Sequence, residues 1–225
     1  MTTRVELTPT QGALSGELAE PSGTGKVGGI VLIQEWHGVN EHIRAQVDRF
    51  AAAGFLTVAP DLYHGKIATN DTDAAAMMNA LDFGKAVGEI GAAVRSLKEN
   101  PRSNGKVAVL GFCMGGALSL ASACNLPGLA AVVAFYGTPD VDQLDLKKVT
   151  APILAHFAKH DEWAKPEKAE LIKQRMDALG KPMELYVYDA GHAFMRDTDP
   201  TKYAPAAAES AWARTIAFLE KTIGK

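Results

Sequence analysis

VAVLGFCMGG, residues 107–116, places a run of apolar side chains directly before Cys113, with glycines on both sides of the cysteine. The apolar run is typical of a buried strand, and the small residues ALSLA at 117–121 favour a helix. A reactive side chain at a sharp strand-to-helix turn has a strained backbone, and the strand and helix approach each other closely there. The flanking glycines permit that approach because they carry no Cβ atom. Cys113 is therefore the candidate nucleophile.

The rest of the chain alternates apolar strands with helical segments. We expect strands at 4–7, 14–18, 29–34, 55–59, 106–110, 130–135, 153–157 and 183–188. We expect helices at 41–53, 73–99, 114–123, 166–179 and 204–223, with the second interrupted near Gly84 or Gly88. The first two strands are expected to be antiparallel. The later alternation predicts a mostly parallel sheet with helices on both faces. Together with the turn at Cys113, this predicts an α/β-hydrolase fold in one domain, residues 1–225, with no separate cap domain.

Composition limits the classes of function. The 225 residues carry a net charge of −3, which argues against nucleic acid as a partner. The first residues, MTTRVE, lack the apolar stretch of a signal peptide, and no apolar run is long enough to span a bilayer. Two cysteines do not make a disulfide framework, so we expect reduced thiols. We therefore expect a cytoplasmic protein that acts as a monomer, without a membrane or nucleic acid partner.

Two further side chains are expected to join Cys113 at the carboxyl ends of the strands, where open α/β sheets bind ligands. Asp161 follows the expected strand at 153–157, and His192 follows the strand at 183–188. The order of nucleophile, acid and histidine is that of an α/β-hydrolase triad. His192 would accept the thiol proton, and Asp161 would fix the imidazole tautomer. Glu162 is the rival acid.

Glu35 ends the expected strand at 29–34, in the sequence QEWHGVN. This loop supplies one oxyanion donor in α/β-hydrolases, and the residue after the nucleophile supplies the other. The backbone N–H groups of Trp36 and Met114 are therefore the expected oxyanion pair. A carboxylate beside a thiol opposes thiolate formation unless it moves or accepts the proton.

These residues together resemble the dienelactone hydrolase family, also called carboxymethylenebutenolidases. The resemblance covers QE followed by GVN at 34–40, the cysteine turn, Asp161, GHAFMR at 191–196 and the last helix. It implies a Cys113, Asp161 and His192 triad, and a Glu35 that swings toward the thiol when substrate binds. It also implies that Arg196 binds the carboxylate of a small lactone or ester substrate. The aromatic residues Tyr63, Phe135 and Tyr136 are expected to line the pocket.

The sequence departs from the family in one respect. Family enzymes that act on dienelactone carry a second carboxylate-binding arginine after the strand at 55–59, but residues 63–94 contain no arginine. Lysine cannot reproduce the two-pronged contact of arginine, so the particular lactone or ester stays open. We expect no metal site and no cofactor, because the histidines near Asp161 lack a third ligand at a convincing spacing.

Two other functions stay open from the residues alone. A second enzyme family carries a glutamate and a cysteine elbow, as in stress-response deglycases and intracellular cysteine peptidases. Histidine usually follows the cysteine there, whereas Met114 follows it here. The third interpretation is a non-catalytic ligand-binding or redox-sensing protein on the same fold, in which Cys113 is a reactive thiol.

Overall fold

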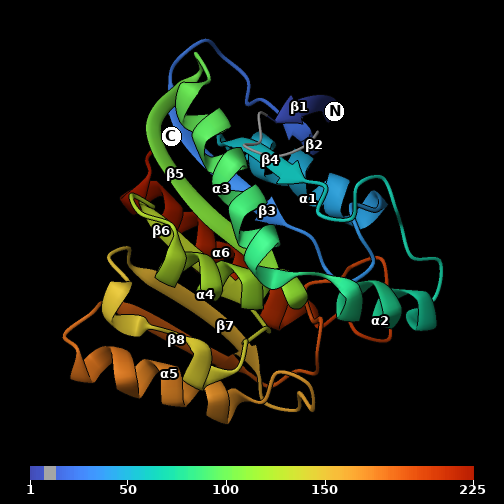
Figure 1. Ribbon diagram of the computed structural model, residues 1–225, viewed down its shortest axis with the longest axis vertical. Helices are drawn as coiled ribbons and strands as arrows, with labels where there is room; N and C mark the ends of the chain where they lie inside the picture. Colours follow the sequence, from blue (N-terminus) through green and yellow to red (C-terminus); the bar gives the residue numbers. More distant parts are fainter. Residues whose placement is uncertain (8–13) are drawn as a thin grey trace.

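The computed structural model describes residues 1–7 and 14–225, and one eight-stranded sheet forms its centre (Figure 1). The strands lie in the order β1-β2-β4-β3-β5-β6-β7-β8. Their bounds are β1 Thr3–Leu7, β2 Leu14–Ala19, β3 Val27–Ile33, β4 Leu56–Pro60, β5 Ser103–Phe112, β6 Ala131–Phe135, β7 Ile153–Ala158 and β8 Met183–Tyr188. β1 and β2 form an antiparallel pair, β2 pairs with β4 antiparallel, and every pair from β4 through β8 is parallel. The predicted mostly parallel sheet is confirmed.

Helices cover both faces of the sheet. Their bounds are α1 Glu41–Ala52, α2 Asp71–Ala80, α3 Phe83–Glu99, α4 Met114–Asn125, α5 Pro166–Ala178 and α6 Pro205–Thr222, with short 3-10 turns at Val141–Gln143 and Leu146–Lys148. One core cluster joins α3, α4 and α5 to one face of the sheet, and a second joins α1 and α6 to the other. The central strands are buried on both sides. Their continuous apolar sequences follow from that environment.

The long helix expected at 73–99 is two helices, α2 and α3, which are separated at Leu81 and Asp82. The expected interruption is present, but it lies just before Gly84 and not at either glycine. The Asp82 side chain accepts a hydrogen bond from the backbone N–H of Lys85 at 3.0 Å, so it begins a new helix as its N-cap. The glycines lie inside α3, where the i to i−4 hydrogen bonds tolerate them.

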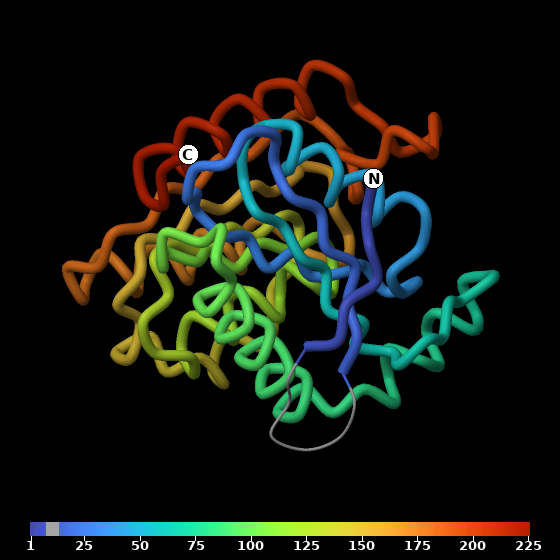
Figure 2. The backbone as a smooth tube through the Cα atoms, turned by 90° about the horizontal axis from the view of Figure 1, so that it is seen from above, coloured from blue at the N-terminus to red at the C-terminus, as the bar shows by residue number. Residues whose placement is uncertain are grey.

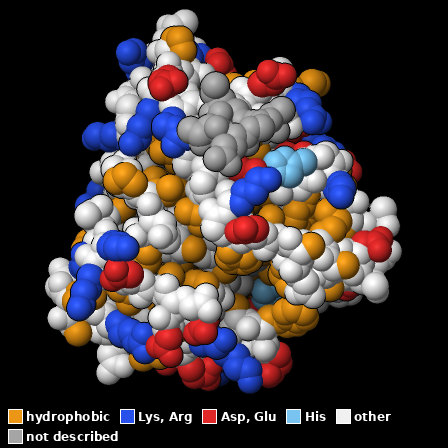
Figure 3. All heavy atoms as spheres, in the orientation of Figure 1, with side chains coloured by type: hydrophobic (Ala, Val, Ile, Leu, Met, Phe, Trp, Pro, Cys, Tyr) orange, Lys and Arg blue, Asp and Glu red, His pale blue; other side chains and the backbone are white. Residues whose placement is uncertain are grey.

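α2 has little contact with the rest of the molecule. Its only buried residue is Ala74. In Figure 2 the segment around residues 70–80 projects from the body of the chain. On the face drawn in Figure 3, hydrophobic side chains gather beside α2, whereas charged side chains of both signs gather over α5. α2 is thus a peripheral element rather than a part of the core.

A buried polar cluster lies between β7, β8 and α6. His156 of β7 is fully buried, with Nδ1 2.9 Å from the Tyr188 hydroxyl and Nε2 3.0 Å from the Thr215 hydroxyl. Burial, together with the nearby charge of Arg214, lowers the pKa of His156 to about 3. His156 is therefore a neutral residue of the core, and both of its ring nitrogens are engaged by hydroxyl groups.

The described helices include none that is both long and apolar enough to cross a lipid bilayer.

The parallel strands bring the segments after β3, β5, β7 and β8 to the same edge of the sheet. Each of these four segments carries one of the candidate residues Glu35, Cys113, Asp161 and His192. The fold thus collects residues that are up to 157 positions apart in sequence (from 35 to 192).

Candidate active site

Cys113 stands at the turn between β5 and α4 with a strained backbone, φ 54° and ψ −118°. Its N–H donates to the carbonyl of Phe135 at 3.0 Å, which ties the turn to β6. A Cβ atom on Gly111 would lie 2.3 Å from the carbonyl oxygen of Gly115, and one on Gly137 would lie 1.9 Å from the carbonyl oxygen of Cys113. Side chains at these glycines would displace the turn. The glycines therefore hold a conformation that presents the sulfur at the helix N-terminus.

His192 joins Cys113 to Asp161 in a chain of three side chains. Its Nε2 lies 3.2 Å from Cys113 Sγ, and its Nδ1 lies 2.7 Å from Asp161 Oδ2. The other carboxylate oxygen of Asp161 accepts hydrogen bonds from the backbone N–H groups of Trp163 at 2.8 Å and Ala164 at 2.9 Å. Asp161 is only 3% exposed. Its orientation is therefore fixed by three donors, one of which is the imidazole.

The electrostatics of the chain favour a charged imidazole. Burial alone would lower the pKa of His192, but the hydrogen bonds and charges of Asp161 and Cys113 outweigh burial and raise it to about 10. Burial likewise opposes the charged form of Asp161, but the hydrogen bond and charge of His192, with the two backbone donors, hold the pKa of Asp161 below its usual value. These surroundings therefore favour a protonated His192 when Cys113 carries the negative charge of a thiolate, and they favour an ionised Asp161.

Glu35 and Arg196 form a long, incomplete pair beside this chain. Glu35 follows β3 and is 2% exposed, and its Oε2 lies 3.9 Å from Arg196 Nε. Neither Glu35 Oε1 nor Arg196 Nε has a hydrogen-bond partner among residues 1–7 and 14–225. Charged groups that are buried this deeply normally make several hydrogen bonds. The pair is therefore suited to rearrangement when a further polar group enters.

Cys113 opens into a cavity of about 190 Å³. Glu35, His192 and Arg196 line this cavity together with Cys113. The remaining lining includes the apolar side chains Trp36, Met78 and Trp163 and the charged side chains Asp71 and Lys202. The site therefore combines a nucleophile with both cationic and apolar surface.

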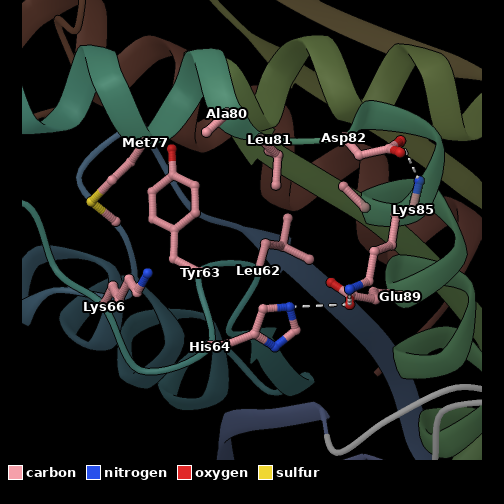
Figure 4. A pocket seen from close by; sticks show the side chains of 11 residues that line it. Leu62, Tyr63, His64, Lys66, Met77, Ala80, Leu81, Asp82, Lys85 and Glu89 are labelled. Atoms are coloured by element: carbon pink, nitrogen blue, oxygen red, sulfur yellow. Dashed lines mark hydrogen bonds and ion pairs between the residues drawn. The ribbon is translucent and has the colours of Figure 1, made fainter.

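A second cavity, of about 340 Å³, lies beside α2 and is lined by none of the three side chains in the Cys113–His192–Asp161 chain (Figure 4). His64 and Lys85 approach the Glu89 carboxylate there, at 3.2 Å and 4.0 Å, and burial raises the pKa of Glu89. Tyr63 lines this second cavity, and its hydroxyl donates to Met114 Sδ at 3.3 Å. This second cavity is therefore separate from the chain of side chains that begins at Cys113.

Comparisons with known proteins show the family to which this chain belongs. The model of the dienelactone hydrolase family matches residues 14–223. The chain belongs to the dienelactone hydrolase family. It is 35% identical over 217 residues to Protein usf of Aquifex pyrophilus, with 92% of each chain covered. It is 32% identical over 220 residues to a Bradyrhizobium protein named probable 2-oxo-3-(5-oxofuran-2-ylidene)propanoate lactonase, with 90% of this chain and 87% of that one covered.

A solved structure agrees in fold. It is described as a dienelactone hydrolase-like promiscuous phosphotriesterase from metagenomic libraries, and it superposes with a TM-score of 0.86 at 21% identity over 100% of this chain and 99% of that one. Membership of the dienelactone hydrolase family, which the family model shows, makes this protein a hydrolase.

In this member of the dienelactone hydrolase family, four of the expected site residues line one cavity: Glu35, Cys113, His192 and Arg196. The fifth, Asp161, contacts His192. Trp36 also lines the cavity, and Met114 is the first residue of α4, directly after the cysteine. The rival acid, Glu162, is exposed and pairs with Lys165 at 3.4 Å. Asp161, not Glu162, contacts His192.

The expected aromatic lining differs from the observed one. Phe135 and Tyr136 are fully buried, and neither lines the cavity at Cys113 within the described ranges. Tyr136 instead packs edge-on against the His192 ring, with centroids 5.2 Å apart, and Tyr63 lines the second cavity. The structure thus gives Tyr136 a packing contact behind the histidine rather than a surface that a substrate touches.

Five lining residues were not predicted from the sequence: Asp71, Met78, Trp163, Ala193 and Lys202. Trp163 lies two positions after Asp161, and its exposed fraction of 66% is unusual for so large an apolar side chain. The adjacent motif could have drawn attention to it. Lys202 and Met78 lie in segments without a recognisable motif, so only the fold places them.

Proposed function

We propose that this protein is a cysteine-dependent hydrolase of small carboxylate-bearing esters or lactones. The observation that carries the proposal is His192, which lies within hydrogen-bonding distance of both Cys113 Sγ and Asp161 Oδ2. A nucleophile, a base and an orienting acid in this contact are the elements of acyl transfer. The proposed substrates agree with the names of the related proteins.

In the first half of the reaction, Cys113 Sγ attacks the carbonyl carbon of the substrate as a thiolate. The carbon–oxygen bond to the leaving group breaks, and imidazolium Nε2 of His192 gives its proton to the leaving oxygen. The product is a thioester on Cys113 together with an alcohol, which stays attached to the acyl group in a lactone. Asp161 keeps the imidazole in the orientation that this transfer needs.

In the second half, His192 accepts a proton from water as the water oxygen attacks the thioester. The carbon–sulfur bond breaks, which releases the carboxylic acid and restores the thiolate. Negative charge develops on the carbonyl oxygen in both halves. We assign its stabilisation to the backbone N–H groups of Trp36 and Met114, which follow β3 and begin α4.

Arg196 is proposed to bind the substrate carboxylate. Its Nε has no hydrogen-bond partner in the part of the chain that the structure describes, and its guanidinium can present two parallel donors to a carboxylate. A carboxylate that binds there competes with Glu35 for the same cation. Displaced Glu35 is then free to turn toward Cys113 and help to remove the thiol proton.

The test compares hydrolysis of a dienelactone and of simple aryl esters by the wild-type protein, Cys113→Ala and Cys124→Ala. Cys124 is the second free cysteine, buried on α4, and serves as the matched control. We expect Cys113→Ala to lose measurable activity and Cys124→Ala to retain it. Mass spectrometry of a quenched reaction should detect an acyl group on Cys113. Equal rates for wild type and Cys113→Ala would overturn the proposal.

A further inference from the structure

We propose that the preferred substrates carry a carboxylate and, across the scissile bond, an aromatic or similarly flat apolar group. Lys202 and the Trp36–Trp163 pair are the residues that select for these two parts. This inference rests on the proposed function and deepens it. It depends on two groups of side chains in the lining of the Cys113 cavity, one cationic and one aromatic.

The cationic group consists of Arg196 and Lys202, both from the segment between β8 and α6. No arginine occurs in residues 63–94, after β4, and Lys202 enters the cavity from a different segment. Lys202 lies 3.7 Å from Asp199, and this pair is partly exposed. Such pairs contribute little stability, so the lysine can exchange Asp199 for a substrate carboxylate at little cost.

Two carboxylates in the same lining limit the substrate to one anionic group. Glu35 is buried beside Arg196, and Asp71 lies 3.3 Å from His37 Nε2 at the start of α2. Two cations therefore face two anions before a substrate enters. One additional carboxylate can be accommodated when Glu35 turns away, whereas a second would be repelled by Asp71.

The aromatic group consists of Trp36 and Trp163, which pack edge to face with centroids 5.5 Å apart. Trp163 follows Asp161 by two positions, and Trp36 follows Glu35 by one, so both indoles are anchored to residues of the site itself. Met78 of α2 adds a third apolar side chain to the lining. An indole that is 66% exposed at such a position gains contact area when a flat apolar group binds.

The size of the cavity agrees with one ring. A cavity of roughly 150 Å³ can hold a benzene molecule, and this one measures about 190 Å³. The ring would fill most of the enclosed volume. The carboxylate would then lie toward Arg196 and Lys202, where it remains partly in contact with water.

Three esters distinguish the preference for a carboxylate from the preference for an aromatic ring. Monophenyl adipate carries both groups, monoethyl adipate lacks the ring, and a phenyl ester with an isopropyl group in place of the carboxylate lacks the charge. Phenol is a better leaving group than ethanol, so phenyl esters react faster whatever the pocket. Selection for the ring is therefore measured as the change in the phenyl-over-ethyl ratio of kcat/KM between the wild-type protein and a variant, and selection for the charge as the ratio between the two phenyl esters. Rates with Cys113→Ala give the uncatalysed background for each ester.

Two variants, each with a matched control, then test whether Lys202 selects for the carboxylate and Trp163 for the ring. Lys202→Met should reduce the preference for the charged over the uncharged phenyl ester about three- to fivefold, the effect of one partly exposed charge. Trp163→Ala should reduce the preference for phenyl over ethyl about three- to tenfold. Lys168→Met and Leu171→Ala, at exposed positions of α5, are the controls.

The outcomes distinguish the two proposals. If the wild-type protein hydrolyses none of the esters faster than Cys113→Ala, the proposed function fails. If it hydrolyses all three with equal kcat/KM, or if Lys202→Met and Trp163→Ala behave like their controls, the inference on substrate class is overturned and the proposed function stands.

Discussion

Replacement of Asp161 by asparagine tests how the three side chains cooperate. The oxygen that accepts from the N–H groups of Trp163 and Ala164 must remain an oxygen, because an amide NH₂ there would face two donors. The NH₂ group of Asp161→Asn is therefore forced toward His192 Nδ1, where the carboxylate now lies at 2.7 Å. The imidazole must then accept at Nδ1 and carry its proton on Nε2.

The loss of activity in Asp161→Asn has two causes, a lower pKa of His192 and a changed tautomer. A rise from 6.5 to about 10 corresponds to roughly 5 kcal/mol in favour of the imidazolium, shared between Asp161 and Cys113. In the variant, a neutral imidazole with its proton on Nε2 faces Cys113 with a donor and cannot accept the thiol proton. We predict that kcat/KM falls on the order of a thousandfold or more, as expected for a base held in the wrong tautomer.

The same change should alter stability at alkaline pH. A group whose pKa is raised by folding contributes stability that is complete below its unfolded pKa and is lost as pH rises through its folded pKa. The contribution of His192 is therefore lost between pH 6.5 and about 10. We expect the denaturation midpoint of the wild-type protein to fall over this range, and that of Asp161→Asn to fall less.

The assays are ester hydrolysis under kcat/KM conditions and urea denaturation at several pH values. Asp189→Asn is the matched control, because Asp189 contacts His160 at the same distance of 2.7 Å but on the surface. It should leave hydrolysis unaffected. If Asp161→Asn retained activity within a few-fold of the wild-type protein, the assignment of the tautomer and of the role of Asp161 would be refuted.

Three further predictions follow from other contacts. Gly137→Ala places a Cβ atom 1.9 Å from the carbonyl oxygen of Cys113, so unfolding by urea should show a loss of about 3 kcal/mol or more. Glu35→Gln removes a negative charge 3.9 Å from Arg196, so KM for a carboxylate-bearing ester should fall about two- to fivefold in steady-state assays. His156 titrates at about 3 in the fold against 6.5 unfolded, so its contribution to stability is complete above pH 6.5 and should be lost toward pH 3, by up to roughly 5 kcal/mol, in denaturation curves compared with those of His156→Gln.

Each of these predictions has a control in the same chain. Gly88→Ala adds a Cβ atom that meets nothing within 4 Å inside α3, and should raise stability by about 0.5–1 kcal/mol. Glu162→Gln removes an exposed carboxylate and should leave KM unaltered. His160→Gln replaces an exposed histidine, and its stability should follow that of the wild-type protein between pH 6.5 and 3. Agreement between a test variant and its control would contradict the contact invoked.

The strands were predictable because the environment of each dictates its composition. The central strands are buried on both faces, and their sequences are continuous apolar runs that periodicity detects. The break between α2 and α3 was misplaced because glycine suggested it, whereas capping by Asp82 decides it. A cap depends on one side-chain hydrogen bond, which a hydrophobic pattern does not record.

The site residues that could be predicted are those that lie in a recognisable motif or directly after a predicted strand. Cys113 and its glycines form a continuous motif, and Asp161 and His192 follow strands whose order is fixed by topology. Lys202 and Met78 were not predictable, because their side chains reach the cavity only through tertiary packing of irregular or peripheral segments. Phe135 and Tyr136 were expected to line the pocket because they lie at the end of a strand. They are instead fully buried in the core.

The weak attachment of α2 has a consequence for how new substrate ranges could arise. The helix buries only Ala74, yet it contributes Asp71 and Met78 to the wall of the cavity at Cys113. Apart from Ala74 and the two methionines that pack against the core, Met77 and Met78, substitutions in this helix should change the wall of the cavity with little effect on the layers that fold the chain. A randomised library confined to residues 71–80 should yield many stable proteins with altered selectivity, which makes this helix a natural starting point for directed evolution.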